Sequence, residues 1–177
     1  MSDASGEDPA GALITFRGVV YPAQCDAMGH MNVQHYTAVF DQAMWHLVAH
    51  LGFKSSWVQE HREGWADVRY VIEFRKELHA GQLFHAESEL VKVGNSSLVT
   101  HHRIVENESR ALAAEVEMTS VYFDLEKRSS RTLPVEIRAA ARRLLAAGRA
   151  PKDGQGEARA SSGPLSAAND GKGKIQA

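Results

Sequence analysis

The stretch Asp26-Ala27-Met28-Gly29-His30-Met31-Asn32 runs without a break into a long, largely apolar segment, residues 33–51. In this segment apolar residues recur at steps of three and four, which is typical of a helix and not of a strand. They are Tyr36, Val39, Phe40, Ala43, Met44, Leu47, Val48 and Leu51. Asn32 is a candidate N-cap and Gly52 a candidate helix stop. The predicted helix is about 28 Å long at about 1.5 Å per residue, and its broad apolar stripe requires burial.

Strand patterns dominate after this helix. Apolar residues alternate with polar ones over 67–74, and three more strand-like segments follow, at 84–93, 98–105 and 112–122. We also predict an opening strand over 13–24 and a terminal helix over 135–145. Short turn sequences join the later strands, which favours hairpins and therefore an antiparallel sheet. The prediction is an α+β fold with a five-stranded antiparallel sheet against one long helix.

The two ends of the chain differ from its middle. Residues 1–11 are small, acidic and unpatterned, and we expect a flexible N-terminus. Residues 148–177 are mostly Ala, Gly, Ser, Lys and Pro, with few large apolar residues to offset the entropy of ordering. We therefore expect a disordered C-terminal tail, and a single domain at 12–147.

Bulk composition narrows the setting of this domain. The chain has 177 residues and a formal net charge of −2, so it carries no basic footprint for nucleic acid or an anionic membrane. Its single cysteine, Cys25, excludes an intrachain disulfide framework and suits a reducing compartment. We find neither a signal peptide nor an apolar run long enough to cross a membrane, so we predict a cytoplasmic protein.

The loop before the helix carries the candidate chemistry. Asp26 is a possible base or nucleophile, His30 a possible proton carrier, and the helix start offers free backbone N–H donors. This is the arrangement that acyl transfer requires. Each residue also has a structural explanation: an Asx-turn for Asp26, packing for His30, an N-cap for Asn32 and a positive φ for Gly29.

The order of these features resembles the hotdog-fold acyl-CoA thioesterases of the 4-hydroxybenzoyl-CoA thioesterase type. The resemblance covers roughly residues 15–131 and is supported by the segments 74–81 and 94–97. Its sharpest matches are Asp26, Gly29, His30, Asn32 and Tyr36. It departs from the family at Gln82, where an acidic residue often follows the turn glycine, and at Val33-Gln34, where Asn is more usual. It implies a sheet wrapped around the long helix and hydrolysis of an acyl-CoA thioester to the free acid and CoA.

The resemblance also implies roles for individual residues. Asp26 would attack the thioester carbonyl or activate a water that does, and the backbone N–H of Val33 would polarise that carbonyl. His30 would orient the thioester or shuttle a proton, and Asn32 would position water or the acyl oxygen. Gly29 would serve the backbone of this loop.

Further residues are candidates for binding the substrate. Arg128 and Arg131 carry guanidinium groups suited to the phosphates of CoA, and the turn containing Gly94, Ser96 and Ser97 offers N–H and hydroxyl donors. Tyr36 belongs to the same candidate set. We predict no cofactor.

The other histidines receive structural interpretations. His46 and His50 have a spacing that can bind zinc, but no carboxylate or cysteine nearby completes a set, so we predict no metal site. His101 and His102 are neighbours on a strand and should point to opposite faces, one to the surface and one to an interface.

The expected partners are an acyl-CoA substrate and a second copy of the chain. A homodimer or homotetramer would cover the open sheet edges. Two alternatives stay open: a hotdog hydratase or dehydratase, and a non-catalytic protein that binds acyl-CoA or an acyl carrier. The sequence does not distinguish among acyl groups, between CoA and an acyl-carrier protein, or between a nucleophilic and a basic Asp26.

Overall fold

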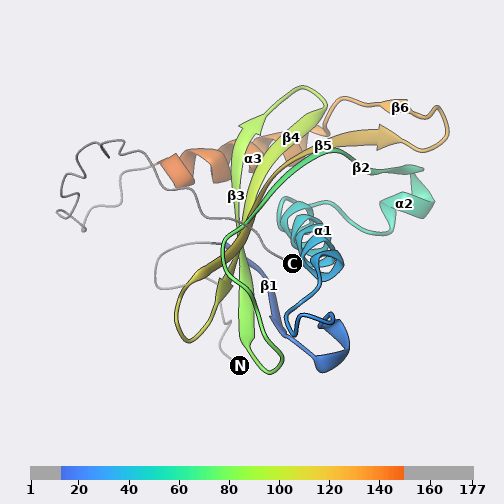
Figure 1. Cartoon of the computed structure of the whole chain (residues 1–177). Helices are drawn as coiled ribbons and strands as arrows, with labels where there is room; N and C mark the ends of the chain where they lie inside the picture. The colour runs from blue at the N-terminus through green and yellow to red at the C-terminus, as the bar shows by residue number, and fades with distance from the viewer. Residues whose placement is uncertain (1–12, 150–177) are drawn as a thin grey trace, which may run out of the picture.

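One long helix lies against a strongly curved antiparallel sheet in the computed structural model, which describes residues 13–149 (Figure 1). The elements follow the chain as β1, a short 3-10 helix η1, α1, α2, β2, β3, β4, β5, β6 and α3. Their bounds are β1 Leu13–Val19, η1 Pro22–Gln24, α1 Val33–His50, α2 Trp57–Glu60, β2 Glu63–Phe74, β3 Leu83–Val93, β4 Ser97–Glu106, β5 Leu112–Asp124, β6 Ser129–Ser130 and α3 Val135–Arg149. The predicted α+β architecture is confirmed.

The sheet places its strands in the order β1-β3-β4-β5-β2, with the two-residue β6 paired to β5. All pairings are antiparallel. The strand order puts β1 and β2, which precede and follow α1, at opposite edges of the sheet. A bulge interrupts the pairing of β2 with β5 between Asp67 and Arg69. α1 connects the two edge strands, and the connection after β2 crosses the sheet a second time to reach β3 beside β1. The hairpins β3–β4 and β4–β5 then lead back to β2.

The core joins α1 to one face of the sheet. The apolar stripe of α1 is buried as predicted: Tyr36, Val39, Phe40, Ala43, Met44, Leu47 and Val48. On β4, Leu98, Thr100, His102 and Ile104 are fully buried, whereas the residues between them are only partly covered. This alternation is the two-residue period of a strand with one face in the core. α3 runs behind β3 and β4 in Figure 1, and its Ile137 and Ala141 belong to the same core.

The structure corrects several boundaries of the predicted elements. The opening strand ends at Val19, not at residue 24, because the proline at position 22 lacks a backbone N–H and starts the 3-10 helix η1. β2 begins at Glu63, earlier than the alternating pattern indicated, because pairing with β5 continues to Asp124. α1 ends at His50, with Leu51 as its C-cap and Gly52 at a φ of 101°.

The C-terminal half departs from the sequence-based expectation in two respects. The strand β6 was not predicted, since two residues carry no periodicity. α3 extends to Arg149, past the expected end at 145 and into the first two residues of the segment expected as tail. The expectations for residues 1–11 and for the rest of 148–177 lie outside the described residues.

His102 corrects a further expectation. It is not at an interface but fully buried within this chain, where its Nδ1 lies 2.6 Å from Ser88 Oγ and its Nε2 2.9 Å from Thr100 Oγ1. Ser88 in turn lies 2.5 Å from the hydroxyl of Thr15 on β1. Burial, with a smaller contribution from His101, lowers the pKa of His102 from 6.5 to about 3. Within residues 13–149, no helix is both long and apolar enough to span a membrane.

Candidate functional site

The loop between η1 and α1 is a closed turn held by its own backbone. Asp26 N donates to His30 O at 3.0 Å and Gly29 N donates to Asp26 O at 3.0 Å, while Cys25 and Met31 form a single antiparallel bridge. Gly29 has a φ of 88°, a conformation that costs little for glycine and more for other residues. The turn therefore brings the side chains of Asp26 and His30 to one side of the loop.

Asp26 and His30 face each other across this turn. Asp26 Oδ1 accepts a hydrogen bond from Met28 N at 2.8 Å, which is the predicted Asx-turn. Its other oxygen, Oδ2, lies 4.0 Å from His30 Nδ1 and has no closer partner among the described residues. One carboxylate oxygen thus fixes the loop, and the second is available to a substrate or a water.

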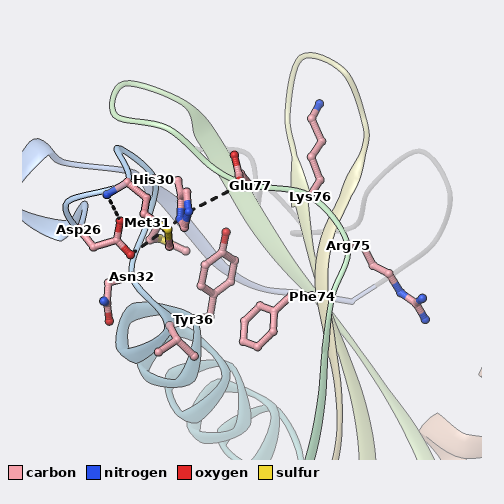
Figure 2. Close-up of a pocket in the computed structure, with 11 residues that line it drawn as sticks. Asp26, His30, Met31, Asn32, Tyr36, Phe74, Arg75, Lys76 and Glu77 are labelled. Carbon is pink, nitrogen blue, oxygen red and sulfur yellow. Dashed lines mark hydrogen bonds and ion pairs between the residues drawn. The ribbon is translucent and has the colours of Figure 1, made fainter. Parts of the chain in front are cut away.

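A second carboxylate, from the connection between β2 and β3, reaches the same imidazole. Glu77 Oε1 lies 3.5 Å from His30 Nε2, and Figure 2 shows His30 between the two acidic side chains. Sequence analysis missed Glu77. Its contact with His30 spans many positions of the chain, and the only signal was its place in the segment 74–81.

Asn32 and Val33 form the start of α1. The side chain of Asn32 accepts a hydrogen bond from Gln34 N at 3.1 Å, so the predicted N-cap is present. The backbone N–H of Val33 has no hydrogen-bond acceptor in the part of the chain that the structure describes. It sits at the positive end of the helix dipole, where an unpaired donor favours developing negative charge. This is the donor that the resemblance assigned to the substrate carbonyl.

These groups line one cavity of about 430 Å³ at the N-terminal end of α1. Its wall consists of Asp26, Met28, His30, Met31, Asn32, Val33, Tyr36, Phe74, Arg75, Lys76 and Glu77. Of the predicted site residues, Asp26, His30, Asn32, Val33 and Tyr36 are brought together here. Mostly apolar walls with a few converging polar groups are typical of small-molecule sites.

Aromatic side chains form the apolar wall. The rings of Tyr36 and Phe74 meet edge to face with centroids 5.3 Å apart. Burial raises the pKa of Tyr36, the negative charge of Glu77 raises it further, and a hydrogen bond with the Leu78 backbone opposes both. The phenol is therefore neutral around pH 7. Phe74 is 52% exposed, so this wall is open to whatever packs beside β2.

The two cationic residues of the wall are committed elsewhere. Arg75 donates to Glu115 on β5 and to Glu73, and Lys76 Nζ donates to Ser109 Oγ at 3.2 Å. Figure 2 shows both side chains directed away from Asp26 and His30. The charged and polar groups that face the Asp26 side of the cavity are therefore two carboxylates, one imidazole and the N-terminus of α1.

The remaining predicted residues lie toward the other end of α1. The turn with Gly94, Ser96 and Ser97 is bonded to β5 through Tyr122 N and Ser96 O. Arg131 forms an ion pair with Glu63 at 2.6 Å, and Arg128 stacks over the ring of Phe123 at 5.3 Å. None of these residues lines the Asp26 cavity. Gly29 shapes the loop without lining the cavity. Among residues 13–149, no group of three or more His, Cys, Asp or Glu side chains is placed to hold a metal ion.

The sequence profile of the thioesterase-like superfamily matches residues 20–142. The chain belongs to the thioesterase-like superfamily. The match includes α1, the loop before it and every strand except β1. No curated protein matches the chain significantly.

Several solved structures superpose on this chain. A Staphylococcus aureus protein in complex with CoA superposes with a TM-score of 0.71 at 14% identity, covering 76% of this chain and 85% of its own. A 1,4-dihydroxy-2-naphthoyl-CoA thioesterase from Synechocystis gives 0.66 at 18% identity, covering 74% and 96%. A DHNA-CoA thioesterase from S. aureus gives 0.68 at 15% identity, covering 77% and 95%. At these identities the likeness establishes the hotdog fold.

Proposed function

We propose that this chain hydrolyses an acyl-CoA thioester to the free acid and CoA at the Asp26 cavity. The proposal rests on two groups that line the same cavity. One is the carboxylate oxygen of Asp26 that is free of hydrogen bonds, and the other is the backbone N–H of Val33, which has no acceptor among the described residues. Membership of the thioesterase-like superfamily supports the reaction class.

In the proposed reaction the thioester carbonyl oxygen accepts a hydrogen bond from Val33 N–H. Charge that develops on this oxygen is stabilised by the helix start, a fixed donor that needs no reorganisation. Asp26 either adds to the carbonyl carbon or removes a proton from the attacking water. His30 carries a proton between Asp26 and the cavity, and Asn32 holds the first turn of α1 in place. The apolar wall around Tyr36 and Phe74 takes the acyl group.

A second function is favoured by one observation. Asp26 accepts the Met28 N–H in an Asx-turn, and a loop aspartate in a non-catalytic acyl-CoA-binding protein would do the same. The two functions differ in turnover. A thiol-release assay over a panel of acyl-CoAs separates them: hydrolysis releases CoA in multiple turnovers, whereas a binding protein releases none and shows saturable binding only.

We further propose that the working form is a homodimer or a higher assembly built from it. β2 is an edge strand, and its Val68, Val71 and Phe74 are 62%, 41% and 52% exposed. Open apolar edges invite pairing with another strand. Because Phe74 also lines the Asp26 cavity, a second copy beside β2 would close that wall. The predicted substrate contacts of Arg128, Arg131, Gly94, Ser96 and Ser97 would then have to come from that second copy.

Sedimentation and activity measured across a dilution series test the assembly. We expect a dimer at micromolar concentration and a loss of specific activity as dilution produces monomer. Val71→Lys should produce monomer and lower activity, whereas Val135→Lys, at the exposed start of α3, should do neither. A fully active monomer would refute the shared site while leaving the Asp26 chemistry intact.

A further inference from the structure

We propose that Glu77 is a positioning residue that, with His30 and Asp26, forms a carboxylate–imidazole–carboxylate chain at the mouth of the cavity. This inference rests on the hydrolytic function proposed above and adds a residue to its machinery. These three side chains lie in a row, from Glu77 on the β2–β3 connection, through the His30 imidazole, to Asp26 in the loop before α1 (Figure 2).

The geometry of His30 carries the inference. Its Nδ1 faces Asp26 Oδ2 at 4.0 Å and its Nε2 faces Glu77 Oε1 at 3.5 Å. The His30 side chain is 18% exposed and Glu77 64% exposed, so the pair has a partly covered inner member and an accessible outer one. Both ring nitrogens therefore point at carboxylates on opposite sides, and the ring has one orientation that serves both.

The backbone around Glu77 is hydrogen-bonded to the loop between η1 and α1. Met31 N donates to Leu78 O at 2.7 Å, and His79 Nδ1 lies 3.1 Å from Gly29 O. Leu78 is fully buried, which anchors the residue next to Glu77 in the core. These contacts on the C-terminal side of Glu77 tie the connection to the loop, so the position of Glu77 relative to His30 is built into the fold.

Other titratable groups near His30 do not replace Glu77 in this arrangement. The phenol of Tyr36 is neutral, and Arg75 and Lys76 are directed to other partners. His79 Nε2 lies 3.9 Å from Glu77 Oε2, so it occupies the second carboxylate oxygen. Cys25 precedes Asp26 and its thiol is directed to Tyr21 O at 3.8 Å. Glu77 is the group placed to accept the Nε2–H of His30.

Each carboxylate favours the neutral tautomer that carries the proton on the nitrogen facing it, and Glu77 is the closer of the two, at 3.5 Å against 4.0 Å for Asp26. The proton is therefore placed on Nε2. The lone pair of Nδ1 then faces Asp26. During hydrolysis the water oxygen bonds to the thioester carbon, and the water proton passes by way of the Asp26 carboxylate to Nδ1. When the C–S bond breaks, its electron pair leaves with sulfur, and the imidazolium returns the proton to that thiolate. The products are the free acid and CoA–SH, with no further reactant required.

The two contacts of His30, at 4.0 and 3.5 Å, are longer than ordinary hydrogen bonds. Catalytic hydrogen bonds often tighten only in the substrate complex. An acyl group in the cavity would also exclude water from the carboxylates and strengthen their interaction with the ring. Glu77 is exposed in this structure, so we expect a moderate contribution to rate.

The kinetic test compares Glu77→Leu with Glu77→Gln. Loss of the acceptor in Glu77→Leu should lower kcat about 10-fold, with KM nearly unchanged, because orientation of a proton carrier acts on the chemical step. Glutamine keeps an acceptor oxygen and should retain more of the activity. Glu126→Leu is the matched control, since Glu126 is 71% exposed and 3.9 Å from Arg62 at the β5–β6 turn. In a His30→Ala background, Glu77→Leu should cause no further loss.

A second measurement does not depend on turnover. Nitrogen NMR of the imidazoles at alkaline pH reports which ring nitrogen of His30 carries the proton. We expect Nε2–H in the wild type and in Glu77→Gln, and a mixture of tautomers in Glu77→Leu. An unchanged tautomer together with full kcat in Glu77→Leu overturns the role of Glu77. If Asp26→Asn keeps its turnover, the proposed hydrolytic site fails instead, and the NMR result still decides the arrangement around His30.

Discussion

At its N-terminal end α1 meets Asp26, His30 and Glu77, and toward its C-terminal end the sheet gathers Glu63, Tyr122 and Arg131. In the second group the Tyr122 hydroxyl donates to Glu63, and Arg131 holds Glu63 at 2.6 Å. In the first group the ring of His30 stands 4.0 Å from Asp26, and the nearby Val33 N–H has no acceptor within residues 13–149. Both groups are polar and both include a buried or half-buried acid.

The difference lies in how completely each group is satisfied. Buried polar groups in proteins are almost always paired, so a fully paired cluster needs no explanation beyond stability. At the first end, the 4.0 Å between His30 and Asp26 and the N–H of Val33 without an acceptor leave hydrogen-bonding capacity that a ligand in the cavity could use. We therefore propose that the first end of α1 carries the chemistry, and that the contacts among Glu63, Tyr122 and Arg131 within one chain hold β2, β5 and the β5–β6 hairpin together.

Asp26→Asn is the strongest way to break this comparison. It keeps the size of the side chain and the Asx-turn acceptor but removes the base or nucleophile. We expect kcat to fall at least about 100-fold, the range for losing such a group. Melting temperature should barely change. Retention of most of the turnover on a good acyl-CoA would show that the loose end of α1 is not where the reaction occurs.

Tyr122→Phe tests the opposite end and should give the opposite result. It removes the hydrogen bond to Glu63 in a buried setting, and bonds to charged groups of this kind contribute about 2 kcal/mol. We expect that loss in denaturant unfolding, with kcat nearly unchanged. Tyr21→Phe is the control, because Tyr21 is 62% exposed and should show no loss. A large drop in kcat at unchanged stability would reverse the assignment of the two ends.

His102 sharpens the comparison, since it is a satisfied histidine in the core. Its pKa is about 3 in the fold against 6.5 for an ordinary histidine, because burial disfavours its charged form. Below pH 6.5 the unfolded chain binds a proton that the folded chain does not. Stability is therefore fully present above pH 6.5 and falls with acidification, by at most about 1.4 kcal/mol per pH unit.

The measurement is unfolding free energy between pH 6.5 and 5, above the range where most carboxylates titrate. His102→Gln should flatten this slope, even if the variant is less stable at pH 7. His46→Gln, at an exposed position on α1, should leave the slope as it is. Equal slopes in all three proteins would mean that His102 titrates normally.

Asn32→Ala should have the smallest effect of the series. Losing the cap of α1 costs about 1 kcal/mol, and Asn32→Ser, which keeps a capping oxygen, should recover most of it. If Asn32 acts on activity only through the cap, kcat follows the same order. A serine variant that is stable but slow would show that the amide itself contacts the substrate.

The site loop was predictable from sequence because its contacts are local. Asp26, Gly29 and His30 bond to one another within a few residues, and Asn32 caps the helix that follows it directly. The long helix was predictable for the same reason: its burial follows a period that the chain displays. Strand boundaries were less certain, since β2 continues to Glu63 only because Asp124 is there to pair with it.

The parts that sequence could not provide depend on distant partners. Glu77 reaches His30 because Met31 and Leu78 bond across the loop, and no local pattern announces that contact. Arg131 has the chemistry of a phosphate ligand, yet Glu63 lies nearby in the fold and pairs with it. Residue type alone does not show which partners the fold places beside Glu77 and Arg131.

The closed turn before α1 determines which of its positions can be substituted without moving Asp26 and His30. Its backbone bonds join Asp26 to Gly29 and His30, so they fix the reactive groups without involving the side chains at the tip. Met28 stands at that tip, 74% exposed and on the cavity wall. Replacing it would reshape the entrance while the acid and the imidazole keep their places. Under the proposed function, single substitutions at Met28 would change which acyl groups enter the cavity, so Met28 is the position to randomise in a directed-evolution library.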